Sequence, residues 1–129
     1  MRTFLVRSSF ALAVLLLAAC GQSATPPTGA CAAAYTPAVI AIVTDSLTGL
    51  APAGTPSGLA QTGAYVDTLR PWSGVQTTMA GGGIAGTYSV HIALAGYADW
   101  NRSNIAVTPS GFCGELNSVT LHANLVPTP

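Results

Sequence analysis

Three cysteines and two histidines are the first side chains to consider for thiol or metal chemistry in this 129-residue sequence. A nucleophile needs an adjacent base that a third group orients, and the sequence holds no Gly-x-Ser-x-Gly elbow. Cys31 and Cys113, far apart in the chain, and the separated His91 and His122 lack the local spacing of a zinc site. The sequence therefore predicts no catalytic residue, no metal ligand and no cofactor. The three cysteines need another explanation.

The residues before Cys20 have the order of an export signal. Two arginines give a positive start, residues 10–17 (FALAVLLL) form a short apolar core, and two small alanines follow. This order is typical of a secretory signal sequence. The uncharged run 8–20 is shorter than the roughly 20 residues that cross a bilayer as a helix. We therefore expect a signal helix that is removed, and no permanent transmembrane anchor.

The run Leu17-Ala18-Ala19-Cys20 resembles the lipobox of bacterial lipoproteins. In that family the cysteine thiol receives a diacylglycerol, a signal peptidase cuts before it, and the new amino terminus is usually acylated too. The resemblance implies that residues 1–19 are a lipoprotein signal peptide and that Cys20 is the lipidation site, with acyl chains enough for stable anchoring. Gly21 stands where an aspartate would redirect sorting, which by analogy favours the outer membrane if the host is Gram-negative. The alternative is an ordinary secretory signal followed by an incidental cysteine.

With Cys20 assigned to lipid, Cys31 and Cys113 remain as an even pair in an exported protein. One stands just before the first expected strand and the other just before the last, so they can meet at one end of a sandwich. We therefore expect a disulfide between them. Because the loop that it closes is long, the chain-entropy model gives it roughly 4 kcal/mol.

Removal of the signal peptide takes two of the four basic residues with it. The mature chain then has two arginines against four acidic residues and no lysine. This balance argues against a nucleic-acid partner and against an electrostatic hold on anionic lipid. Residues 20–34, rich in Gly, Pro, Ser, Thr and Ala, are typical of a flexible tether. Residues 35–127 have the length of one small domain.

The domain has the pattern of an all-β fold. Apolar and polar residues alternate over 86–95 and again over 118–125, as in strands with one buried face. Residues 38–44 (AVIAIVT) are typical of a central strand. Short strands separated by turns favour a β-sandwich. We expect weaker strands at 61–69, 75–79 and 104–108, a mobile loop at 49–58, and turns at 45–49, 70–71, 81–83, 96 and 109–111.

Four segments resemble the carboxypeptidase regulatory-like domains. Val43-Thr44-Asp45 with Thr48-Gly49 is similar to their first strand and turn, and residues 85–90 are similar to their "G-x-Y-x-V" strand. Residues 95–97 match the "x-G-Y" that comes after it, and residues 119–127 are similar to the last strand. The resemblance implies a single transthyretin-like, Ig-like β-sandwich of about seven strands over 35–127, preceded by the signal-peptide helix and the tether.

Three of these motif residues have a structural explanation that needs no ligand. The Asp45 carboxylate can accept backbone N–H bonds and close the turn after the first strand. Gly96 can adopt a positive φ to end a strand. Tyr97 can bury its ring while its hydroxyl stays hydrogen-bonded.

One enzymatic alternative is a metal-dependent enzyme of a related sandwich fold. Intradiol dioxygenases hold iron with two tyrosines and two histidines, for which this chain offers Tyr88, Tyr97, His91 and His122. The close "H-x-H" pair of that family is missing. In a regular strand Tyr88 also points to the face opposite His91. The sequence therefore favours a protein that is not an enzyme.

Aromatic residues suggest a binding alternative. Trp72 follows a proline in an expected turn, and Trp100 is followed by Asn101 and Arg102. Two exposed tryptophans beside planar hydrogen-bonding groups would suit a glycan or a partner protein of the envelope, whereas buried tryptophans would only cap the core. The sequence thus predicts a non-catalytic, lipid-anchored envelope protein with a structural or interaction role, and glycan or protein binding at these four residues is the alternative.

Overall fold

The computed structural model describes Cys31 and residues 35–129. The expected signal helix, Cys20 and most of the tether lie outside these residues. Within them the chain forms nine strands and no helix, so no helix there is long and apolar enough to cross a membrane. The strands are β1 (Val39–Asp45), β2 (Ser57–Thr62), β3 (Tyr65–Trp72), β4 (Val75–Gly81), β5 (Gly86–Ala93), β6 (Trp100–Val107), β7 (Pro109–Ser110), β8 (Glu115–Leu116) and β9 (Val119–Leu125).

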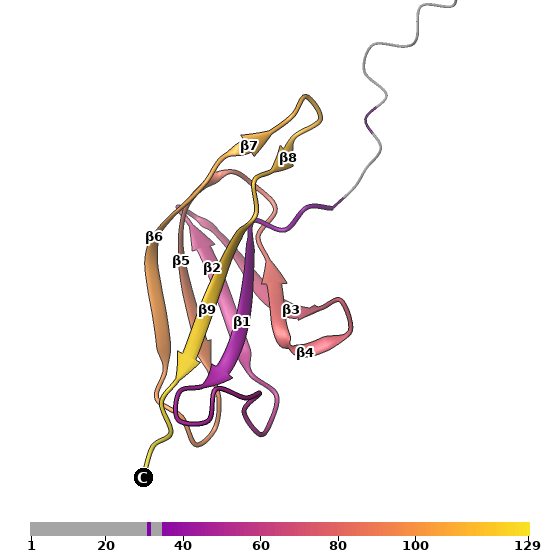
Figure 1. Cartoon of the computed structure of the whole chain (residues 1–129). Helices are drawn as coiled ribbons and strands as arrows, with labels where there is room; N and C mark the ends of the chain where they lie inside the picture. The colour runs from indigo at the N-terminus through magenta and orange to yellow at the C-terminus, as the bar shows by residue number, and fades with distance from the viewer. Residues whose placement is uncertain (1–30, 32–34) are drawn as a thin grey trace, which may run out of the picture. The chain divides into compact units, whose positions relative to one another are not determined.

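Seven strands form one bent sheet in the order β6-β5-β2-β3-β4-β1-β9 (Figure 1). Neighbours are antiparallel except β1 and β9, which run parallel. The early part of β3 pairs with β2 and its end pairs with β4, so β3 belongs to two layers. One layer is β6-β5-β2-β3, and the other is β3-β4-β1-β9. The predicted all-β, sandwich-like fold with seven main strands is confirmed.

The core lies between these layers and is filled by every second side chain of the strands. In β5 the side chains of Tyr88, Val90 and Ile92 are buried, and in β9 those of Leu121, Ala123 and Leu125 are buried. Both faces are those that the alternation predicts. The rest of the buried apolar cluster comes from β1 and the residue before it, from β6, from single residues of β2, β3, β4 and β8, and from the residue after β5: Ala38, Val39, Ala41, Val43, Ala60, Leu69, Met79, Leu94, Ile105, Val107 and Leu116.

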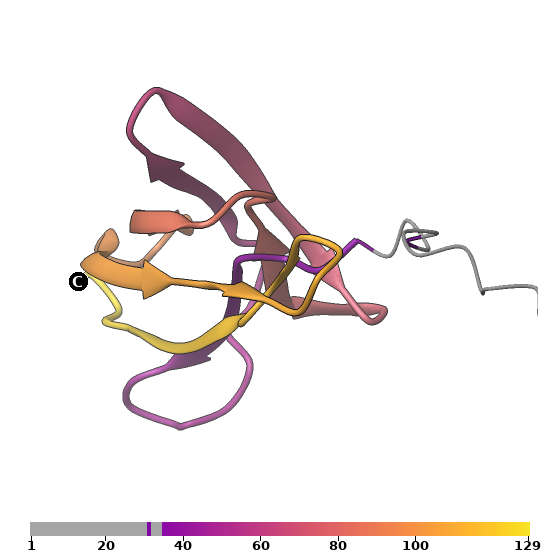
Figure 2. The ribbon, with the colours of Figure 1, turned by 90° about the horizontal axis from the view of Figure 1, so that it is seen from above.

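The two ends of the sandwich are distinct. Because β1 and β9 are parallel, both begin at one end, where the short β7–β8 hairpin also lies, and we call this the hairpin end. Both strands finish at the other end, beside the C-terminus, which we call the distal end (Figure 1). Figure 2 looks down on the hairpin end. In both views β6 and β9, the outer strands of the sheet order, lie near one another, and β6 contacts β9.

The expected strand at 61–69 is wrong in its bounds, because the segment folds into two strands. Gly63, with φ of 56°, makes a tight turn at which β2 ends and β3 begins. Thr62 therefore pairs with Tyr65 across a hairpin. The expected loop 49–58 is also too long, since β2 already begins at Ser57.

Three other expected boundaries are wrong, and irregular strand pairing accounts for the first two. The expected turn at 70–71 lies inside β3, where the register shifts between Pro71 and Trp72, and a proline is tolerated at such an irregularity. The expected strand 104–108 is β6, which begins earlier, at Trp100. A bulge with Asn104 at φ of 59° interrupts the alternation of β6 and hides its first half in the sequence pattern. The expected turn at 109–111 is partly the strand β7.

Candidate functional site

The predicted disulfide between Cys31 and Cys113 is confirmed. Their Cα atoms lie 5.3 Å apart, a spacing that a relaxed disulfide spans. Cys113 occupies the turn between β7 and β8 rather than the position just before the last strand. The bond therefore joins the segment that leads into β1 to the tip of the β7–β8 hairpin.

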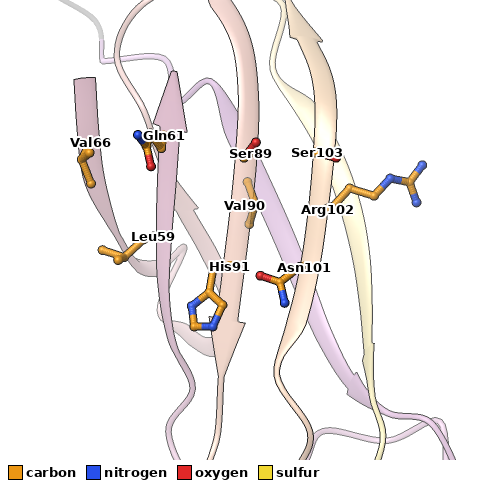
Figure 3. Close-up of a pocket in the computed structure, with 9 residues that line it drawn as sticks. All are labelled: Leu59, Gln61, Val66, Ser89, Val90, His91, Asn101, Arg102 and Ser103. Atoms are coloured by element: carbon orange, nitrogen blue, oxygen red, sulfur yellow. The ribbon is translucent and has the colours of Figure 1, made fainter. Parts of the chain in front are cut away.

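A shallow depression of about 420 Å³ lies on the outer face of the β6-β5-β2-β3 layer (Figure 3). The depression results from the strand register, in which Leu59 of β2 pairs with His91 of β5, and His91 pairs with Asn101 of β6. Paired residues share a face, so these three side chains form a row across three strands. The full lining is Leu59, Gln61, Val66, Ser89, Val90, His91, Asn101, Arg102 and Ser103.

The depression combines apolar surface with planar polar groups. Leu59 and Val66 are 46% and 53% exposed, which leaves bare apolar surface beside the amides of Gln61 and Asn101. Nε2 of His91 lies 3.1 Å from Oδ2 of Asp99, and the two side chains are 42% and 61% exposed. Figure 3 shows Arg102 pointing away from the other side chains of the site. Apolar contact beside hydrogen-bonding amides is the chemistry of a small polar ligand with one apolar face.

Of the four residues predicted for binding, the structure brings only Asn101 and Arg102 to this depression. Trp100 pairs with Ile92 and packs against the core. Trp72 borders a separate hollow at the end of β3, where its ring meets Tyr35 edge-to-face at 6.1 Å between centroids. The two tryptophans are half-buried and do not form a shared platform.

Sequence reasoning missed Leu59, Gln61 and Val66. Alternation within 57–62 would have placed Leu59 and Gln61 on one face, but the turn at Gly63 had first to be recognised. Their neighbourhood with His91 depends on β2 pairing with β5, which no local pattern reports.

The four side chains considered for iron are not brought together. Tyr88 is fully buried, and its hydroxyl donates to the backbone oxygen of Ile84 at 2.8 Å. His91 lies on the opposite face of β5, and His122 is exposed on β9, in the other layer. Over Cys31 and residues 35–129, no three His, Cys, Asp or Glu side chains gather as a metal site would require.

Asp45 and Tyr97 have the structural roles that the sequence predicts. Oδ1 of Asp45 accepts the N–H groups of Leu47 at 2.7 Å and Thr48 at 3.1 Å, which closes the turn after β1. The Tyr97 hydroxyl donates to Oδ2 of Asp45 at 2.8 Å. This bond, followed by the two backbone bonds, lowers the pKa of Asp45, and the same bond raises the pKa of Tyr97. Gly96 has the expected positive φ, 85°.

No protein-family model matches the chain, and no curated protein matches it either. Any assignment of function therefore rests on the chain's own residues.

Proposed function

We propose that the chain is a non-catalytic, lipid-anchored protein of the cell envelope with a structural or interaction role. The observation that carries the proposal is the disulfide between Cys31 and Cys113. Such bonds form in oxidising compartments outside the cytosol. The bond uses two of the three cysteines, so the cysteine that remains is Cys20, which ends the lipobox-like run. In a Gram-negative host, Gly21 after this cysteine favours the outer membrane.

The folded part is proposed to be a carboxypeptidase regulatory-like, transthyretin-like domain. The seven-stranded, sandwich-like fold supports this assignment. So does the contact between Asp45 and Tyr97, since the resemblance rests on two separate motifs that hold these residues. The roles of both residues are structural, in keeping with a module that supports or connects rather than catalyses.

Metabolic labelling with a fatty acid tests the anchor. The wild-type chain should carry label and float with membrane vesicles, whereas Cys20→Ser should carry none and should stay uncut or soluble. The matched control is Cys31→Ser with Cys113→Ser, which removes two cysteines and should retain the label. A mature wild-type chain without lipid would refute the proposal.

A second candidate function, glycan binding, is favoured by the depression on the outer face of the β6-β5-β2-β3 layer. Its row of Leu59, His91 and Asn101 offers apolar contact beside hydrogen-bonding groups. This site differs from the one that the sequence predicted. It includes Asn101 and Arg102 but neither Trp72 nor Trp100.

Titration calorimetry with envelope polysaccharides tests this candidate. Asn101→Ala should weaken binding about tenfold, as expected for the loss of about 1.4 kcal/mol from one well-placed hydrogen bond. His91→Ala should weaken binding as well, while His122→Ala, an exposed histidine of the other layer, should not. Equal effects of the two histidine variants would exclude the depression as the site.

A further inference from the structure

Phe112 is the most exposed large apolar residue among those that the structure describes, at 88%. It lies in the turn between β7 and β8, and this hairpin extends beyond the long strands (Figure 1). A single exposed apolar residue is ordinary on a protein surface. Phe112 is of interest because of its position in the chain, next to a cysteine of the disulfide.

Phe112 precedes Cys113, and Cys113 is bonded to Cys31. Cys31 follows Cys20 by eleven residues. A stretch of that length reaches at most about 40 Å when fully extended. If Cys20 carries lipid, this reach together with the 5.3 Å between the Cα atoms of Cys31 and Cys113 limits how far Cys113 can lie from the bilayer, whatever path the intervening residues take.

The chemistry of the hairpin suits an apolar contact rather than a charged one. Gly111 and Gly114 lie on either side of the Phe112–Cys113 tip and add no side chains that would compete with the Phe112 ring for a flat surface. The hairpin holds no basic residue, and its carboxylate, Glu115, disfavours anionic headgroups. Aromatic rings gain free energy at the boundary between headgroups and acyl chains.

The distal end also exposes apolar residues, Leu47 at 80% and Leu50 at 70%. It lies at the opposite end of β1 and β9, so both ends cannot rest on the same bilayer. The disulfide joins Cys31, the described residue nearest to Cys20 in the sequence, to the hairpin, so the chain from the anchor meets the hairpin end first. We propose that Phe112 inserts into the interfacial region of the bilayer and turns the hairpin end of the domain towards the membrane. This inference rests on the proposed lipid anchor at Cys20.

Depth-dependent quenching tests the orientation in the full, processed lipoprotein in phosphatidylcholine vesicles. Phe112→Trp places a fluorophore at the hairpin tip, and Leu47→Trp places a matched one at the distal end. The emission of the parent protein, which comes from Trp72 and Trp100, is subtracted. Brominated acyl chains should lower the added emission of Phe112→Trp at least twofold and leave that of Leu47→Trp unchanged.

Mass spectrometry of the same samples separates the two proposals. Acyl groups on the mature chain with equal quenching of the two variants would overturn the insertion and leave the anchor standing. A chain without acyl groups would overturn both. Protection of Phe112→Trp from an aqueous quencher without quenching by bromolipid would point to burial of the ring against protein, in the same chain or in a second copy, and would also overturn the insertion.

Discussion

At the hairpin end, a covalent bond between Cys31 and Cys113 closes the sandwich. At the distal end, hydrogen bonds do so: the Asp45 carboxylate joins the turn after β1 to Tyr97 in the connection between β5 and β6. Backbone bonds add to this second closure, from Ser46 to Leu125 and from Ala98 to Val126, and a bridge pairs Tyr97 with Pro127.

Because one end is closed by a disulfide and the other by a carboxylate, the stability of the two ends depends on different solution conditions. A disulfide stabilises mainly by restricting the unfolded chain, so its effect depends on redox state. A carboxylate held by hydrogen bonds stabilises the native state only while it is ionised, so its effect depends on pH. Both closures act on the same core, so variants of the core, of the disulfide and of the carboxylate should separate the three contributions.

The core should dominate, and Ile92→Ala measures it. Ile92 is fully buried between the two ends, so the substitution removes buried methyl groups and leaves a cavity. We expect a loss of about 2–5 kcal/mol in the free energy of unfolding. The neighbouring His91→Ala, on the open face, should change it by less than about 0.5 kcal/mol. Urea melts give both values, and comparable losses would show that the register of β5 is misassigned.

The covalent closure should come next. Replacement of Cys31 and Cys113 by alanine removes a constraint on a long loop, for which typical losses are about 2–4 kcal/mol. Thermal melts of the wild type with and without a reductant should show the same loss, and the double variant should no longer respond to the reductant. A melting temperature that neither change lowers would contradict a stabilising role for the bond.

Two glycines, one near each end, allow a matched test of crowding. A Cβ at Gly82 would lie 2.7 Å from Cβ of Ala38 and 2.9 Å from the Tyr88 hydroxyl, and its φ is +81°. At Gly49, φ is +70° but nothing lies within 4 Å. Gly82→Ala should therefore cost about 2–3 kcal/mol, from crowding and conformation together, and Gly49→Ala about 1 kcal/mol from conformation alone. Similar losses in urea melts would mean that the hairpin end rearranges to accept a side chain.

Two features could be predicted from the sequence, one from a local pattern and one from the number of cysteines. The alternation through Tyr88 and Ile92 identified a buried face, and the even pair left after Cys20 identified the disulfide. The turn at Gly63 was missed because the apolar residues on either side looked like one strand.

The depression was missed for a different reason. Its row of Leu59, His91 and Asn101 is set by the pairing of β2 with β5 and of β5 with β6. The residues come from three strands, and β2 and β5 are not neighbours in the sequence. Register between distant strands depends on the whole core, so no local pattern could place these side chains together.

The smallest expected loss of stability comes from removing the Asp45 carboxylate at the distal end. It should be detected as a difference in melting temperature that disappears at low pH. The hydrogen bond from Tyr97 and the backbone bonds lower the pKa of Asp45 below its ordinary value in the folded state. A carboxylate with a lowered folded pKa stabilises fully above its unfolded pKa, about 3.9, and that contribution is lost as the pH falls through the folded value. Asp45→Asn should therefore melt a few degrees below the wild type at pH 7. At a pH below the folded pKa of Asp45, the two proteins should melt alike.

Two further variants isolate the cause of this acid response. Tyr97→Phe removes the hydrogen bond that lowers the pKa most, so its melting temperature should depend less on pH than that of the wild type. The variant that lacks Cys31 and Cys113 should keep the wild-type dependence on pH, because distant and independent sites contribute additively. If Asp45→Asn retained the full acid response of the wild type, the distal end would not be closed by this carboxylate. The contrast between a redox-dependent and a pH-dependent end would then fail.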